Sequence, residues 1–196
     1  MTSSQLSRCL LVAAVVGGAT SCGGSPNEPS RVLRAEVADA AGDAASNPNI
    51  MVSPDLISAS MEVAVDTLSV NVRFAPGTRT GNAWITLYFD TDQNPSTGEG
   101  ITPGGDYRAE TFTGAGFVGI TRYQNAGFSL ITDQVPLNIS ADGMDFRIPL
   151  SMIGNGSGRM NFRFAVQTSL PTFGPGTSTP VLDWMPDLGK SPATVQ

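Results

Sequence analysis

The residues best suited to chemistry lie in an acidic, glycine-rich stretch between Tyr88 and Tyr107. Aspartate and asparagine alternate there, so their side-chain oxygens can turn toward one point while the glycines let the backbone curl around it. Oxygen ligands of this kind are the ones that Ca²⁺ prefers. We therefore predict calcium as the cofactor. The predicted ligands are Asp90, Asp92, Asn94, Glu99 and Asp106.

This loop does not have the pattern of an EF-hand. If Asp90 is the first position, the twelfth is Ile101, where an EF-hand carries a bidentate glutamate. The flanking segments also have the alternation of strands rather than helices. Either Glu99 or Asp106 would have to close the site. The alternative is a solvated hairpin whose carboxylates only hydrogen-bond the local backbone.

A second acidic group consists of Asp39, Asp43 and Asp55. These residues flank a polar segment, residues 44–54, that joins two predicted strands. They could bind one calcium ion only if this segment returns to the edge where it began; otherwise they are turn residues.

The composition excludes several classes of function. The 196-residue chain has no histidine, so it cannot build a Ser-His-Asp or Cys-His catalytic arrangement, or a histidine-containing zinc or haem site. Its 11 basic residues are outnumbered by 17 acidic ones. The basic residues are scattered singly, without the stripe that follows a phosphate backbone. We do not expect nucleic acid as a partner.

The first segment has the layout of an export signal. The apolar run from Cys9 to Val16 is too short to span a bilayer but suits a signal peptide. Small residues follow, and Ala19-Thr20-Ser21-Cys22 resembles the bacterial lipobox, with alanine where leucine is commoner. We predict a signal peptide over 1–21, acylation of Cys22 and a flexible tether over 22–31. The alternative is ordinary cleavage near Ser21.

The predicted anchor makes the membrane a partner through lipid. Several acyl chains on one cysteine give stable anchoring. Gly23 follows the cysteine where aspartate would favour the inner membrane, so we expect the outer membrane of a diderm cell envelope.

The remainder predicts an all-β domain over 32–188 and a C-terminal tail over 189–196. Short runs in which apolar residues alternate with polar ones are separated by tight connections such as Asn125-Ala126-Gly127, where glycine would supply the positive φ. We predict about ten antiparallel strands in a jelly-roll-like β-sandwich, with a single helical turn at Leu150–Ile153. The predicted strands are 32–38, 56–65, 68–74, 83–89, 107–113, 117–123, 128–132, 138–139, 144–149 and 161–168.

Several segments together resemble the DOMON-like sandwiches related to family-9 carbohydrate-binding modules. They are Asp39-Ala-Ala-Gly-Asp43, Asp55-Leu-Ile-Ser58, Phe89-Asp-Thr-Asp-Gln-Asn-Pro-Ser-Thr-Gly98, Gly105-Asp-Tyr107, Phe146-Arg-Ile-Pro-Leu-Ser-Met-Ile-Gly154 and Asp183-Trp-Met-Pro-Asp187. The resemblance covers most of 39–187. It implies a secreted β-sandwich with structural calcium, which in some members holds a sugar or haem, and it leaves the ligand open.

We therefore expect a non-enzymatic binding or scaffold module, with a glycan or another surface protein as partner. One alternative is a carbohydrate-binding surface protein. Trp184 is then the candidate ligand-binding residue, because flat aromatic rings stack on sugars, whereas Trp84 is expected in the core. A second alternative is a glycoside hydrolase with a carboxylate pair such as Glu110 and Asp133, although Glu110 is expected to face solvent.

Overall fold

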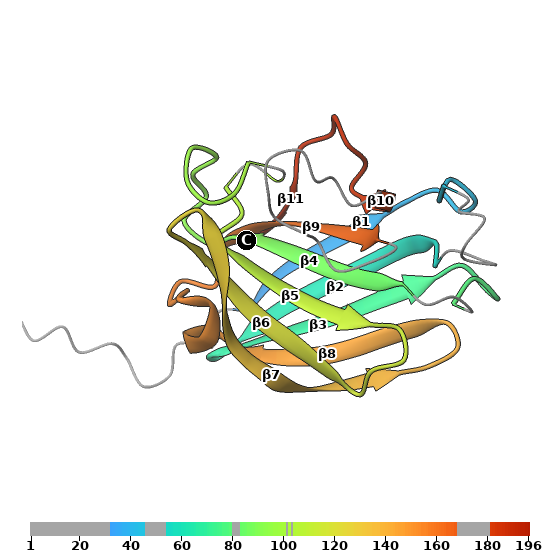
Figure 1. Ribbon diagram of the computed structural model, residues 1–196, viewed down its shortest axis with the longest axis horizontal. Helices are drawn as coiled ribbons and strands as arrows, with labels where there is room; N and C mark the ends of the chain where they lie inside the picture. The colour runs from blue at the N-terminus through green and yellow to red at the C-terminus, as the bar shows by residue number, and fades with distance from the viewer. Residues whose placement is uncertain (1–31, 46–53, 80–82, 101, 103, 168–180) are drawn as a thin grey trace, which may run out of the picture.

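The computed structural model describes residues 32–45, 54–79, 83–100, 102, 104–167 and 181–196 (Figure 1). The predicted signal peptide, the tether, Cys22 and Ile101 lie outside these residues. Within the described ranges the chain folds into strands and one short 3-10 helix, η1 (Leu150–Ile153).

The described part of the chain contains eleven strands. They are β1 (Leu33–Ala38), β2 (Leu56–Ala64), β3 (Thr67–Phe74), β4 (Trp84–Asp90), β5 (Tyr107–Phe112), β6 (Phe117–Gln124), β7 (Gly127–Ile139), β8 (Gly143–Pro149), β9 (Met160–Gln167), β10 (Val181–Met185) and β11 (Ala193–Val195).

All pairings between these strands are antiparallel, in the order β1-β2-β3-β8-β7-β6-β5-β4-β9-β10, with β11 also on β9. The long strand β7 joins two halves of the sheet, because it pairs with β6 along most of its length and with β8 at Leu137–Ile139. At the other side, Arg34 and Gln196 exchange backbone hydrogen bonds of 3.2 and 3.4 Å. The all-β, antiparallel prediction is confirmed. The sheet is nearly closed, so it is barrel-like rather than clearly a sandwich (Figure 1).

The core lies inside this curved sheet. In β3 the buried residues alternate with partly exposed ones, and Leu68, Val70, Val72 and Phe74 all point inward. The same alternation in β8 buries Phe146 and Ile148. Full burial of such a side chain contributes about 1.5–3 kcal/mol, so the two-residue period fixes which face of each strand turns inward.

The last two strands were not predicted. Residues 189–196, expected to form a tail, include β11, which pairs with β9 and buries Val195 completely. β10 pairs with β9 as well. Both strands are short and follow prolines, so neither shows enough alternation to reveal a strand. The predicted strands 128–132 and 138–139 are parts of the single strand β7.

Two turns show where the backbone needs a left-handed residue. Between β6 and β7, Asn125 and Ala126 have φ of 53° and 60°, so these residues, and not Gly127, supply the positive φ. The predicted helical turn at Leu150–Ile153 is confirmed, and it ends at Gly154 with φ of 61°.

Candidate metal centres

The loop between β4 and β5 brings together part of its predicted ligand set. Asp90 is the last residue of β4 and is buried, whereas Asp92 and Asp106 lie further along the loop and are more exposed. One carboxylate oxygen from each lies within 4.8 Å of the others. Strands flank the loop on both sides. Of the two residues considered for closing the site, Asp106 is the one near Asp90.

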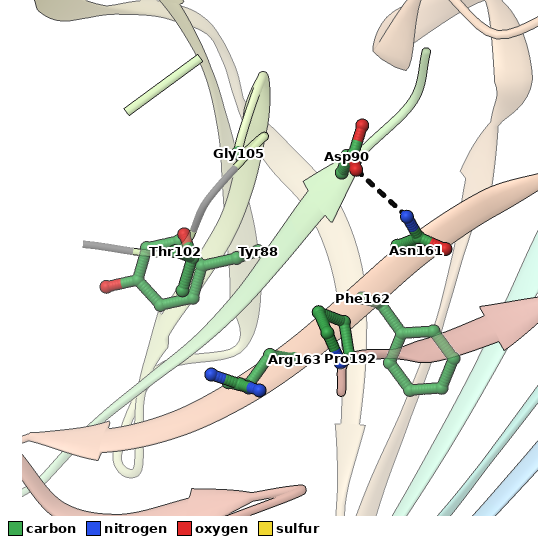
Figure 2. A pocket seen from close by; sticks show the side chains of 8 residues that line it. All are labelled: Tyr88, Asp90, Thr102, Gly105, Asn161, Phe162, Arg163 and Pro192. Carbon is green, nitrogen blue, oxygen red and sulfur yellow. Dashed lines mark hydrogen bonds between the residues drawn. The ribbon is translucent and has the colours of Figure 1, made fainter. Parts of the chain in front are cut away.

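The carboxylates of Asp90, Asp92 and Asp106 already accept hydrogen bonds from groups of the protein. Asp90 accepts hydrogen bonds from the backbone N–H of Asn94 at 3.0 Å and from the side-chain amide of Asn161 at 2.9 Å (Figure 2). Asp92 accepts from the Thr97 hydroxyl at 3.1 Å. Asp106 accepts from the backbone and hydroxyl of Thr91. Local hydrogen bonding therefore accounts for much of this loop without an ion.

Glu99 does not join this group of carboxylates, and Asn94 contacts Asp90 and Asp92 through its backbone N–H. The side-chain oxygen of Asn94 accepts a hydrogen bond from the backbone N–H of Ser96 at 3.1 Å. Glu99 is 3% exposed, and its Oε1 accepts from the Thr102 hydroxyl at 2.9 Å. Burial raises the pKa of Glu99 to about 7.

Beneath the loop, the outer face of β4 and β5 carries a buried polar layer. Tyr88 pairs across the strands with Arg108, whose guanidinium lies 3.3 Å from Oε1 of Glu110. All three side chains are buried. Burial lowers the pKa of Arg108 and raises the pKa of Glu110. Because Glu110 is buried and paired with a cation, the expectation that it faces solvent is wrong.

The second predicted acidic group gathers at the other end of the sheet. Asp43 follows β1, Asp55 precedes β2, and one carboxylate oxygen of each lies within 4.8 Å of an oxygen of Asp183 in β10. A second set, Asp39, Asp43 and Asp187, meets the same criterion. Asp43 and Asp55, on either side of the segment 44–54, thus lie at one edge of the sheet, which was the condition for convergence. We call these five aspartates the rim cluster.

The rim cluster contains carboxylate oxygens that no donor satisfies. Oδ2 of Asp55 accepts from the backbone N–H of Gly42 at 2.7 Å, where a φ of 92° at Gly42 turns the chain. Oδ1 of Asp55 is buried without a hydrogen-bond partner, and Asp55 as a whole is 3% exposed. Oδ2 of Asp39 is likewise buried and unpartnered. Buried polar atoms normally have a partner, so these two require an explanation.

The charges in the rim cluster repel one another. Burial raises the pKa of Asp183 to about 6, helped by the neighbouring charges of Asp43, Asp55 and Asp39. Burial also raises the pKa of Asp39, with Asp187 and Asp43 adding to the effect. A divalent cation would relieve both the repulsion and the missing hydrogen bonds.

Sequence reasoning missed two members of the rim cluster, Asp183 and Asp187. Both belong to the Asp183-Trp-Met-Pro-Asp187 segment that contributed to the family resemblance, but they lie far along the chain from Asp55. The pairing of β10 with β9, together with the hydrogen bond from Leu56 to Asp183, brings this segment to the edge.

The two tryptophans lie on the outer face of the sheet. Trp184 is half-buried, with its ring 6.1 Å from that of Tyr88 and 6.0 Å from the guanidinium of Arg163. Trp84 is also half-buried and packs on Phe112 at 5.5 Å. Trp84 is therefore not a core residue, contrary to expectation.

No protein-family model matches the chain, and no curated protein matches it. In the described part of the chain, no helix has the length and apolar character needed to cross a membrane.

Proposed function

We propose that this chain is a calcium-stabilised binding or scaffold module, held outside a membrane by acylated Cys22. The observation that carries the calcium part is the buried, unpartnered Oδ1 of Asp55, which lies in a group with the carboxylates of Asp43 and Asp183. Carboxylates so close together destabilise the fold unless a cation compensates them. The anchor rests on the sequence of residues 1–22.

Calcium at the rim cluster would join parts of the chain that are distant in sequence. Asp43 belongs to the turn after β1, Asp55 to the start of β2 and Asp183 to β10. An ion held by all three would therefore fasten the first strands to β10. Binding to the folded state alone stabilises a protein by about 2.7 kcal/mol when the ligand is at 100 times its Kd.

The test is thermal unfolding of the full-length, detergent-solubilised chain in calcium and in chelator. We expect a higher midpoint in calcium, and a much smaller difference in Asp55→Asn. Asp66→Asn is the matched control, because Asp66 is exposed and outside all three acidic groups. An identical wild-type midpoint in calcium and chelator would refute the calcium proposal.

A carbohydrate-binding surface protein is the second candidate, favoured by the half-buried Trp184 on the outer face. A glycan array probed with and without calcium separates it from a scaffold. The hydrolase alternative receives less support. Glu110 is buried against Arg108, and Asp133 is exposed and accepts a hydrogen bond from Gln134.

A further inference from the structure

Arg163 is a buried cation without a carboxylate partner. It projects from the outer face of β9, opposite Tyr88, and is 6% exposed. One of its nitrogens donates to the backbone carbonyl of Lys190, but its Nε–H has no acceptor. No carboxylate in the described part of the chain forms an ion pair with it. A buried guanidinium is costly unless an anion or a set of acceptors compensates it.

A groove opens beside this guanidinium. Its volume is about 380 Å³, which is in the range of small-molecule sites. We call it the β9 groove. Its lining includes Asp90, Pro95, Asn161, Arg163, Lys190 and Ser191. Figure 2 draws a neighbouring pocket that shares some of these residues, and it shows Asn161 and Arg163 on β9 with Asp90 on the adjacent strand.

The lining of the β9 groove contains two charged side chains with opposite requirements. One is the guanidinium of Arg163, which lies near Lys190, whose own charge is paired with Asp187. The other is the carboxylate of Asp90, which accepts hydrogen bonds from Asn161 and from the backbone of Asn94. The guanidinium suits a carboxylate ligand, whereas Asp90 suits a hydroxyl donor and repels a second anion.

We propose that the β9 groove binds a sugar acid, with its carboxylate on Arg163 and a hydroxyl donating to Asp90. A ligand that carries a carboxylate and several hydroxyl groups meets both requirements, whereas a neutral sugar leaves Arg163 uncompensated. The pyrrolidine rings of Pro95 and Pro192 add apolar surface for the ring of the ligand. This assignment rests on the binding-module part of the proposed function and does not require calcium at the rim cluster.

The ligand could be a free uronate or a unit of a polyuronate. Calorimetric titration of the full-length chain with galacturonate, galactose, acetate and polygalacturonate separates these cases. We expect galacturonate to bind more tightly than galactose and acetate. If only polygalacturonate binds, the natural ligand is a uronate unit within a glycan. If galactose binds as tightly as galacturonate, the proposal is wrong.

Variants locate the binding in the β9 groove. Arg163→Met should weaken galacturonate binding about tenfold or more, since a charge-assisted hydrogen bond is lost. Arg147→Met is the matched control, because Arg147 is exposed on β8. Ser191→Trp fills the groove while keeping Arg163, so it should abolish binding even if Arg163→Met fails to fold. If a folded Ser191→Trp protein binds galacturonate as tightly as wild type, the ligand does not bind in the β9 groove.

Failure of this proposal can be told apart from failure of the calcium proposal. The titrations are repeated in chelator and with Asp55→Asn, whose effect should be confined to thermal stability. If wild-type protein with a normal melting curve binds none of the four ligands, the sugar-acid proposal is wrong and the calcium proposal stands.

Discussion

Asp183 accepts a hydrogen bond of 2.7 Å from the backbone N–H of Leu56, and this contact places its carboxylate beside that of Asp55. The contact links β10, near the end of the chain, to the start of β2. Both aspartates are buried. The fold thus keeps two acidic side chains together at a point where β2 and β10 meet.

The pKa of Asp183 predicts how stability depends on pH in chelator. Burial raises the pKa of Asp183 to about 6 in the folded state, above the ordinary aspartate value of 3.8, so between these pH values the folded chain holds a proton that the unfolded chain has lost. Stability should fall as pH rises from about 4 to about 6, by an amount on the order of 2 kcal/mol. Asp183→Asn should remove the part of this dependence that Asp183 contributes, because the raised pKa values of Glu99 and Asp39 remain, and it should be more stable than wild type above pH 6. Urea unfolding across this pH range measures it.

In calcium at pH 7, wild type should be more stable than Asp183→Asn, the reverse of the order expected in chelator. With the ion bound, the wild-type Asp183 carboxylate becomes a ligand, and Asp183→Asn should gain less stability from calcium at pH 7. If Asp183→Asn loses less stability than wild type between pH 4 and pH 7 but gains as much from calcium as wild type, Asp183 is not a ligand.

Most strands could be predicted from the sequence because their buried apolar residues recur at every second position, as Leu68, Val70 and Val72 do in β3. It could not predict β11, where three residues carry only one fully buried side chain, Val195. Nor could it join Asp183 to Asp55, because that proximity depends on strand pairing across the whole sheet. Loop residues close in sequence, such as Asp90 and Asp92, could be grouped from spacing alone.

The Asp90 loop should depend on a glycine that no other residue can replace. Gly104 has φ of 86°, and a Cβ there would lie 2.6 Å from the Asp90 carboxylate. Gly104→Ala should therefore displace Asp90 and cost about 1–3 kcal/mol. Gly100→Ala is the matched control, since a Cβ at Gly100 meets nothing within 4 Å. Thermal unfolding of both variants checks this, and equal midpoints would contradict it.

The Arg108–Glu110 pair should behave as a buried ion pair. Arg108→Met leaves the Glu110 carboxylate buried without its cation and should cost about 3–5 kcal/mol. It also removes the guanidinium that lies 3.5 Å from the centre of the Phe128 ring. Arg108→Met combined with Glu110→Leu should recover most of the loss, as a double-mutant cycle in urea would show. Additive losses would mean that the pair does not interact.

The final strand should contribute to the stability of the whole domain. Val195 is fully buried in the core, and Gln196 exchanges backbone hydrogen bonds with Arg34 in β1. Val195→Ala removes buried methyl groups and should cost about 1–3 kcal/mol, whereas Thr194→Ala loses one partly buried hydrogen bond to Asn161 and should cost about 1 kcal/mol. Deleting residues 193–196 should cost more than either, because it removes the β11–β9 pairing. A deletion that leaves the unfolding midpoint unchanged would show that these residues form a tail after all.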